Sequence, residues 1–254
     1  MKLTSVFPAI EGWVANTYGS GSDELFQVLI TAHDGYVFTY NKSDALSVDE
    51  KIQTFTNKPA ALGLFMKASV HSQFNEYDQA QELLKQCLDE ILDNPTEDEK
   101  RLIPLCYNSL GFVVMEYDHD EAIYYLQKAI EYNNKYLTDK PGANIEPLVN
   151  LGMVYYKSGS YIEAVKYFNE ALTQSQQTQN IYKAALCLNN IGLCYLYSGD
   201  QVKGIRILED ALRVAEEHSG KVSHIYAATL QNMTIYYGNL QEQDKCIVIT
   251  KEIA

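Results

Sequence analysis

The chain has 254 residues, 46% of them hydrophobic, and a formal net charge of -13 at pH 7; this composition supports a sizeable core and excludes an intrinsically disordered chain. The acidic balance argues against a nucleic-acid surface, because phosphate binding needs clustered Lys and Arg. The sequence holds no apolar run of about eighteen residues or more, so we expect no membrane span.

The N-terminal residues and the cysteines indicate in which cellular compartment the protein works. MKLTSVFPAIEGWVA is a poor signal peptide, because Pro8 and Glu11 interrupt its short apolar stretch. The five cysteines form no CxxC pair and leave an odd one out, which indicates reduced thiols rather than a disulfide framework. We therefore predict a cytoplasmic protein.

Residues 1–58 are predicted to be an N-terminal cap or extension that is partly helical. The segment DELFQVLITAH (23–33) can form a helix, and SVDEKIQTF (47–55) begins with the Ser-x-x-Glu pattern of a capping box. HDGYVFTY (33–40) alternates enough to permit a strand or an extended segment.

From residue 59 to residue 254 the sequence repeats itself. LVNLGMVYYKSGSYIEAVKYFNEAL (148–172) and LNNIGLCYLYSGDQVKGIRILEDAL (188–212) share Leu, Asn, Gly, Tyr, Ser-Gly and a closing Ala-Leu at an offset of 40. A small residue marks each of five copies, and successive marks are 40 to 43 residues apart: Ala68, Gly111, Gly152, Gly192 and Thr234. A constant period of this length is typical of repeat proteins.

Apolar residues recur at intervals of three and four inside each copy, which predicts two helices per copy. The expected helices lie near 59–74, 77–92, 97–116, 120–137, 143–157, 161–177, 181–197, 201–218, 222–237 and 241–253. They pair into repeats near 59–93, 97–137, 143–178, 181–218 and 222–254.

The third copy shows how such a pair should pack. Its inner faces are expected to carry Leu148, Leu151, Tyr155, Ala164, Phe168 and Ala171. Gly152 opposite Ala164 should let the two helices approach closely. Gly159 should end the first helix, and Ser160 should cap the second in a capping box with Glu163; Thr96 and Glu99 should form the same box in the second copy.

The pattern L-x-x-L-G-x-x-Y, followed by Ala, an aromatic residue and Ala, resembles the tetratricopeptide repeat family over about residues 59–254. The period above forty and the LNNIG motif look like the long repeats of kinesin light chains and of bacterial peptide-pheromone receptors of the Rap and NprR type. The resemblance implies an all-α, right-handed superhelical solenoid of about five helix-turn-helix repeats. Ala68 and Thr234 replace Gly in the end copies, which suits capping repeats.

The resemblance also implies a ligand groove lined by the first helix of each repeat. Its positions carry over to Asn108, Phe112, Met115, Glu116, Val149, Met153, Tyr156, Lys157, Asn189, Leu193, Leu196, Tyr197, Gln231 and Ile235. This is an apolar and aromatic groove with a few amides. The family's clamp for heat-shock-protein C-termini needs Asn and Lys or Arg at positions where only Lys157 fits, so we reject that subfamily.

Asparagine recurs two residues before the marker, at Asn150, Asn190 and Asn232. A side-chain amide donates and accepts at once, so such a ladder can bind the backbone of an extended peptide. The alternative is that these amides bond between neighbouring repeats and set the stacking; both roles can coexist.

Residue types that could carry chemistry are present but poorly arranged for it. Cys187 and Cys194 would lie about 10 Å apart on one helix, too far for a shared metal ion, so we predict that they fill space in the core. The histidines are scattered, and we find neither a phosphate-binding loop nor a nucleophile motif. We predict no catalytic residue, no metal and no cofactor.

The sequence thus predicts a non-catalytic scaffold or adaptor that binds a peptide or protein segment in its groove. One alternative is a peptide-responsive sensor of the pheromone-receptor type. Another is a subunit associated with an enzyme whose chemistry resides in the N-terminal segment or in a partner. Self-association through the end repeats is a further possibility.

Overall fold

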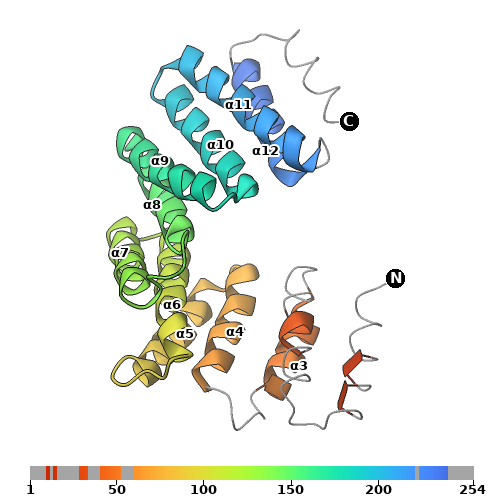
Figure 1. The fold of residues 1–254 in the computed structure, drawn as a ribbon, viewed down its shortest axis with the longest axis vertical. Helices are drawn as coiled ribbons and strands as arrows, with labels where there is room; N and C mark the ends of the chain where they lie inside the picture. The colour runs from red at the N-terminus through yellow and green to blue at the C-terminus, as the bar shows by residue number, and fades with distance from the viewer. Residues whose placement is uncertain are drawn as a thin grey trace. The chain divides into compact units, whose positions relative to one another are not determined.

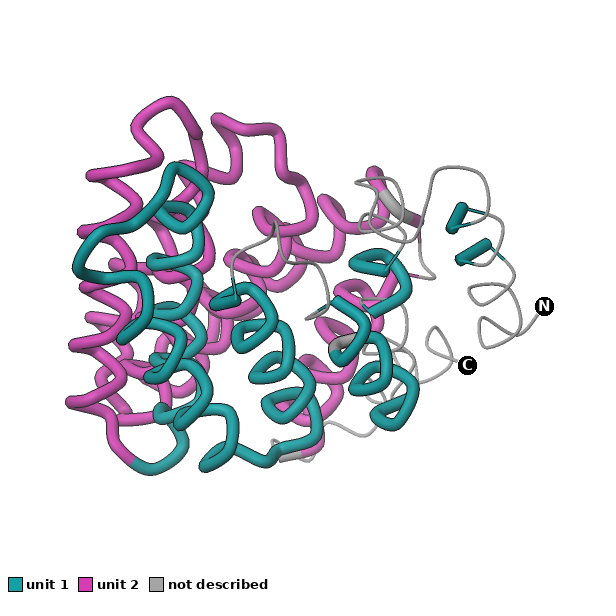
Figure 2. The backbone as a smooth tube through the Cα atoms, turned by 90° about the horizontal axis from the view of Figure 1, so that it is seen from below, with its two compact units in different colours: residues 1–117 teal, residues 118–254 magenta. Residues whose placement is uncertain are grey.

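The computed structural model describes residues 10–11, 14–15, 29–33, 41–52, 60–220 and 223–239. Every regular element in these ranges is an α-helix (Figure 1). The chain divides into two compact units, residues 1–117 and residues 118–254 (Figure 2). The predicted all-α architecture of helix-turn-helix repeats is therefore confirmed over the described residues.

The helices agree closely with the periodicity of the sequence. The first unit contains α3 (Lys42–Ile52), α4 (Ala60–Gln73), α5 (Tyr77–Ile91) and α6 (Glu99–Val114). The second contains α7 (His119–Tyr136), α8 (Ile145–Lys157), α9 (Tyr161–Gln177), α10 (Ile181–Tyr197), α11 (Gln201–Ser219) and α12 (His224–Asn239). From α4 to α12, each helix begins and ends within two residues of its expected bounds. The helix expected at 241–253 lies outside the described residues, as does the segment 33–40 beyond His33.

The described part of residues 1–58 packs as helix against α4. Leu29 and Ala32, from the helical residues 29–33, share a buried cluster with Val48 of α3 and Val70 of α4. The expected helix at 23–33 is thus confirmed for its last five residues.

The predicted helix start at Ser47 is wrong, because α3 already begins at Lys42 and Ser47 lies inside it. Asn41 and Asp44 form the cap instead: the Asp44 N–H donates to Asn41 Oδ1 at 3.3 Å, and Asn41 Nδ2 donates to Asp44 Oδ2 at 2.7 Å. Asn is as good an N-cap as Ser, so the earlier residue starts the helix.

Side chains from two helices meet at Glu76, the residue before α5. Lys42 of α3 pairs with its carboxylate, and His71 Nδ1 of α4 lies 2.6 Å from its Oε2. The hydrogen bond from Lys42, followed by that from His71, lowers the pKa of the Glu76 carboxyl. His71 therefore connects α4 to the residue that precedes α5.

At the start of α6 the predicted capping box is confirmed. The Thr96 N–H donates to Glu99 Oε2 at 2.8 Å, and the Glu99 N–H donates to Thr96 Oγ1 at 3.4 Å. Between α5 and α6, the buried thiols of Cys87 and Cys106 are hydrogen-bonded, with their Sγ atoms 3.3 Å apart, and form no disulfide. Burial, then the neighbouring Cys87, raises the pKa of the Cys106 thiol.

At two glycines of the second unit, a large side chain of the next helix packs against the glycine backbone. A Cβ on Gly152 of α8 would lie 2.5 Å from Cε1 of Phe168 in α9. A Cβ on Gly192 of α10 would lie 2.7 Å from Cγ of Leu208 in α11. The close approach at Gly152 is thus confirmed, but its nearest neighbour is Phe168 and not Ala164.

The fourth repeat has a second glycine at its helix crossing. A Cβ on Gly204 of α11 would lie 2.6 Å from Cδ2 of Leu196 and 2.9 Å from the carbonyl oxygen of Gly192. Glycine on both helices therefore lets the backbones of α10 and α11 nearly touch.

The turns between paired helices use glycine as expected, but one cap differs. Gly159 and Gly199 have φ values of 78° and 94°, in the left-handed region that favours glycine. The predicted box of Ser160 and Glu163 does not form: Ser160 makes no side-chain cap bond, and Ser158 Oγ donates to its hydroxyl at 3.3 Å. The side chains of Asp118, Asn180 and Asp200 are longer than that of serine, and each accepts a hydrogen bond from a backbone N–H in the first turn of α7, α10 and α11.

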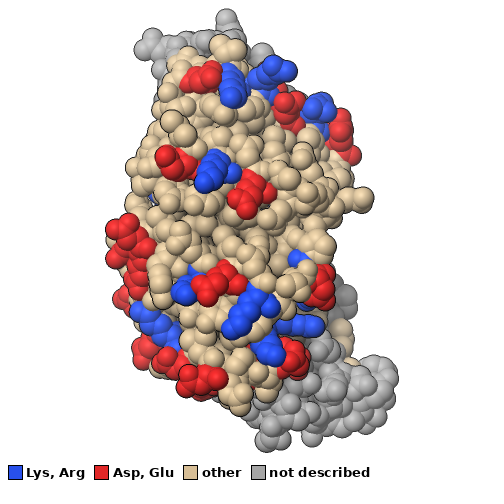
Figure 3. All heavy atoms as spheres, turned by 60° about the vertical axis from the view of Figure 1, so that its left-hand side comes forward, with Lys and Arg blue, Asp and Glu red and all other residues tan. Residues whose placement is uncertain are grey.

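Charged side chains of both signs are interspersed on the surface. On the face drawn in Figure 3, Lys and Arg lie beside Asp and Glu. Ion pairs along single helices include Lys128 with Glu131 at 2.8 Å and Arg213 with Asp210 at 2.9 Å. In the ranges that the structure describes, no helix has the length and apolar character needed to cross a bilayer.

Candidate functional site

One face of the second unit is built from the first helices of three repeats, α8, α10 and α12. Contacts between α10 and both α8 and α12 place the three helices in sequence. The residues at issue lie at helical spacing on each of them: Met153 and Tyr156 on α8, Asn190, Leu193 and Tyr197 on α10, and Asn232, Ile235 and Tyr236 on α12. We call this set the α8–α10–α12 face.

A chain of side-chain amides crosses this face. Asn232 Nδ2 donates to Asn189 Oδ1 at 3.0 Å, and Asn189 Nδ2 donates to Asn190 Oδ1 at 3.1 Å. Asn190 Nδ2 then reaches Met153 Sδ at 3.8 Å. The amides therefore bond between neighbouring repeats, which is the stacking role weighed for them from the sequence.

The members of this amide chain differ in access to solvent. Asn189 is buried, with 5% of its surface exposed, so its two bonds satisfy an amide that water cannot reach. Asn190 and Asn232 are half-buried. A ligand on this face would therefore meet the outer two amides before the inner one.

Three tyrosines gather beside the amides. The ring centroid of Tyr156 lies 5.7 Å from that of Tyr161 and 5.8 Å from that of Tyr197, in tilted arrangements typical of aromatic pairs. Burial, followed by the neighbouring Tyr197, raises the pKa of the Tyr156 hydroxyl. Tyr197 is 56% exposed, so this cluster presents an aromatic surface.

A cavity of about 210 Å³ opens between α10 and α12. Leu193, Leu196 and Tyr197 line it from α10, Asn232, Ile235 and Tyr236 line it from α12, and Gln201 lines it from the start of α11. Its wall is mostly apolar, and Asn232 supplies a side-chain amide that can both donate and accept. Such a cavity can bury one apolar side chain next to a hydrogen-bonding group.

The remaining predicted residues lie elsewhere or are buried. Asn108 and the exposed Phe112 are on α6, which belongs to the first unit, together with the buried Met115. Asn150 is half-buried on α8, Lys157 is the exposed last residue of that helix, and Val149 is buried.

Sequence reasoning missed several residues of the second unit. Tyr161 comes from the second helix of its repeat, and Tyr236 follows Ile235 directly on α12, so neither occupies a family groove position. A larger cavity, of about 470 Å³, lies between α9, α10 and α11, and none of the predicted site residues lines it. Its walls come from two repeats, so no single repeat motif could reveal it.

Cys187 and Cys194 are fully buried in the core of the third and fourth repeats, which confirms that they fill space. Burial raises the pKa of both thiols to about 12. Among the described residues, no group of three or more His, Cys, Asp or Glu is placed to hold a metal ion.

Alkylation should test these thiols. At pH 8 a thiol of pKa about 12 is a thiolate in roughly one molecule in ten thousand, so iodoacetamide should label Cys187 and Cys194 over a thousandfold more slowly than a free cysteine. Peptide mass spectrometry of the native chain measures the rates, with Ser158→Cys in the exposed turn as an internal control. Native labelling of either cysteine at the rate of this introduced control thiol would contradict the burial of its sulfur.

Comparison with known proteins identifies the family that these repeats resemble. Two family models described as tetratricopeptide repeat match the chain, one over residues 145–217 and one over residues 64–99. Among curated protein sequences, none matches.

Several solved structures share the fold. BtubC (BKLC) from P. vanneervenii has a TM-score of 0.65 at 16% identity, over 87% of this chain and 89% of that one. A Rap protein complexed with competence and sporulation factor has a TM-score of 0.65 at 14% identity, over 99% of this chain and 80% of that one. The TPR-like repeats of a putative kinesin light chain from Podosopora anserina reach 0.58 at 14% identity, over 75% of this chain and 94% of that one. The resemblance seen in the sequence is confirmed, and at these identities the likeness concerns the fold.

Proposed function

We propose that this chain, whose residues 64–99 and 145–217 are tetratricopeptide repeats, is a non-catalytic scaffold that binds an extended peptide segment of a partner on the α8–α10–α12 face. The cavity between α10 and α12 carries the proposal. Its volume of about 210 Å³ is below the range of roughly 300–1,000 Å³ usual for small-molecule pockets, so it suits a single side chain.

The chemistry around the cavity specifies the segment. Leu193, Ile235 and the ring of Tyr236 favour an aliphatic or aromatic side chain, because they remove its apolar surface from water. Asn232 lines it, and Asn190 lies one turn before Leu193 on α10; both amides can bond a peptide N–H or C=O. The tyrosine cluster of Tyr156 and Tyr197 continues the apolar surface from the fourth repeat to the third.

A sensor is the second candidate, and one contact favours it. Asn232 of the fifth repeat bonds Asn189 of the fourth, so a peptide that bonds Asn232 would compete with a link between repeats. A change in that link would alter how α12 sits on α10. Hydrogen exchange of α12 with and without peptide would show whether the contact changes.

The test uses peptides selected from a random display library against the full chain. Ile235→Glu should weaken the selected peptides at least tenfold, because binding would then bury a carboxylate in an apolar cavity. Ile162→Glu is the matched control: Ile162 is 81% exposed and outside the cavity, so affinity should change less than about twofold. Calorimetry or fluorescence anisotropy measures the affinities.

If the peptides bind Ile235→Glu as tightly as the natural chain, the proposed face is wrong. Equal weakening by both variants would also contradict it. Circular dichroism of each variant separates loss of binding from loss of fold.

A further inference from the structure

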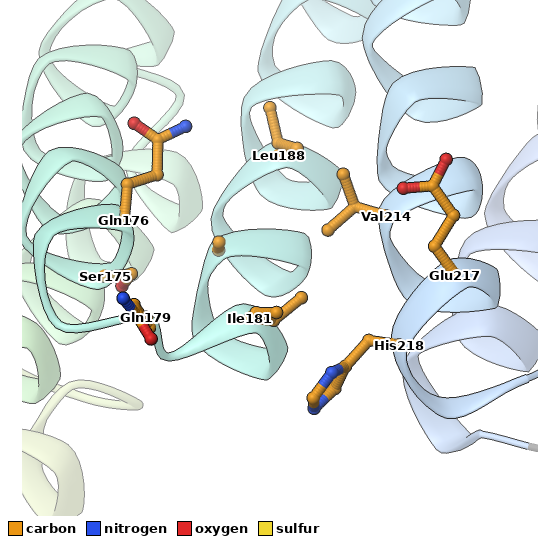
Figure 4. Close-up of a pocket in the computed structure, with 9 residues that line it drawn as sticks. Ser175, Gln176, Gln179, Ile181, Leu188, Val214, Glu217 and His218 are labelled. Atoms are coloured by element: carbon orange, nitrogen blue, oxygen red, sulfur yellow. The ribbon is translucent and has the colours of Figure 1, made fainter.

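The second unit has a larger cavity, of about 470 Å³, that shares no lining residue with the α8–α10–α12 face. It lies where the end of α9, the first half of α10 and the end of α11 come together (Figure 4). Its floor is apolar and comes from Ile181, Ala184 and Leu188 of α10 and Val214 of α11. The floor therefore favours the aliphatic part of a ligand.

Polar groups stand on two opposite sides of this floor. Figure 4 shows Gln176 and Gln179 on the α9 side and Glu217 on the α11 side, with the ring of His218 below Glu217. The two amides offer carbonyl oxygens, and the carboxylate only accepts hydrogen bonds. This rim suits a group that donates several hydrogen bonds and carries positive charge.

The carboxylate of Glu217 is only weakly engaged in the unbound chain. Its Oε1 lies 3.8 Å from Arg213 Nη1, whereas Arg213 Nη2 bonds Asp210 Oδ1 at 2.9 Å. Lys183, a cation in the first turn of α10, is held 2.5 Å from Glu146. Among the described residues, Arg213 and Lys183 thus have closer carboxylate partners, and Glu217 can take another cation.

We propose that this cavity is a second binding site, which takes a basic side chain with an apolar stem, arginine or lysine, from a partner polypeptide. The stem would lie on Ile181, Leu188 and Val214, as long basic side chains commonly do on apolar surface. The cationic head would reach Glu217 and the amide oxygens of Gln176 and Gln179. An arginine should bind more tightly than a lysine, because its planar guanidinium has five hydrogen-bond donors.

The experiment is a methyl NMR titration of the full chain with two tripeptides, acetyl-Leu-Arg-Leu-amide and acetyl-Leu-Glu-Leu-amide. The arginine peptide should give saturable shifts of the Ile181, Leu188 and Val214 methyl groups. The glutamate peptide should bind at least about threefold more weakly, because the rim carries a carboxylate of the same sign. Equal binding of the two peptides to the natural chain overturns the proposal.

Glu217→Gln should weaken the arginine peptide by about two- to fivefold, the range expected for one solvent-exposed ion pair. Glu209→Gln, an exposed carboxylate of the same helix that does not line the cavity, is the control and should leave affinity unchanged. Ala184→Leu fills the floor and should abolish the saturable shifts. An unchanged affinity in Glu217→Gln, or shifts confined to Leu193 and Ile235, overturns the proposal, and Ile235→Glu should leave this site intact.

Discussion

Phe168→Ala should lower the free energy of unfolding of the second unit by about 3–5 kcal/mol, the usual effect of truncating a fully buried phenylalanine. Phe168 has no exposed surface, and its ring lies against Gly152 of the preceding helix. The loss has two parts: the favourable free energy of burying the ring is no longer gained, and its removal leaves a cavity in the core. Urea unfolding followed by circular dichroism measures it.

A double-mutant cycle tests the contact with Gly152. Gly152→Ala alone should destabilise by about 2 kcal/mol, because its methyl group would press on a ring only 2.5 Å away while the helix gains about 1 kcal/mol in propensity. In the Phe168→Leu background the methyl group has room, so the cost should nearly vanish and the two changes should not add. If the two stability changes added strictly, the ring of Phe168 would not pack against Gly152.

Gly204→Val should destabilise the second unit by about 3 kcal/mol, at the upper end of the cost of overpacking a core. A Cβ at this position would lie 2.9 Å from the carbonyl oxygen of Gly192, and backbone cannot swing aside as a side chain can. The same Cβ would lie 2.6 Å from Leu196, which lines the cavity between α10 and α12. Peptide affinity should therefore fall together with stability.

Arg206→Val is the matched control for Gly204→Val. It adds the same side chain to an exposed position of the same helix, where the change should stay within about 0.5 kcal/mol. If Gly204→Val proved as mild as this control, the close crossing of α10 and α11 would be wrong.

Periodicity predicted the helices well because each repeat buries one stripe of each helix. The intervals of three and four residues report that stripe directly, so the helices from α4 to α12 fell within two residues of their observed bounds. The marker glycines were equally readable, since only a small residue can recur where two helices nearly touch. Caps were harder: Ser160 and Ser47 match the capping pattern, yet neighbouring Ser158 and Asn41 decide the local bonds.

The candidate site was predictable only in part, because it depends on contacts between repeats. Family positions identified Leu193, Tyr197 and Ile235, which all line one cavity. They could not show that Asn189 is buried, or that Asn232 bonds it across a sequence separation of 43 residues. Tyr161, Gln176 and Glu217 come from second helices, which the groove positions of the family do not include.

The amide chain from Asn232 to Met153 has a polarity. Each amide donates toward α8, and Asn189 and Asn190 accept from the α12 side; the last donor, on Asn190, ends on a sulfur atom, which is a weak acceptor. An amide carries its donor and its acceptor on opposite arms, so turning Asn232 over would require Asn189, and then Asn190, to turn as well. A ligand that offers Asn232 an acceptor in place of a donor would thus favour the reversed order of hydrogen bonds, in which the Asn190 amide no longer donates to Met153 on α8.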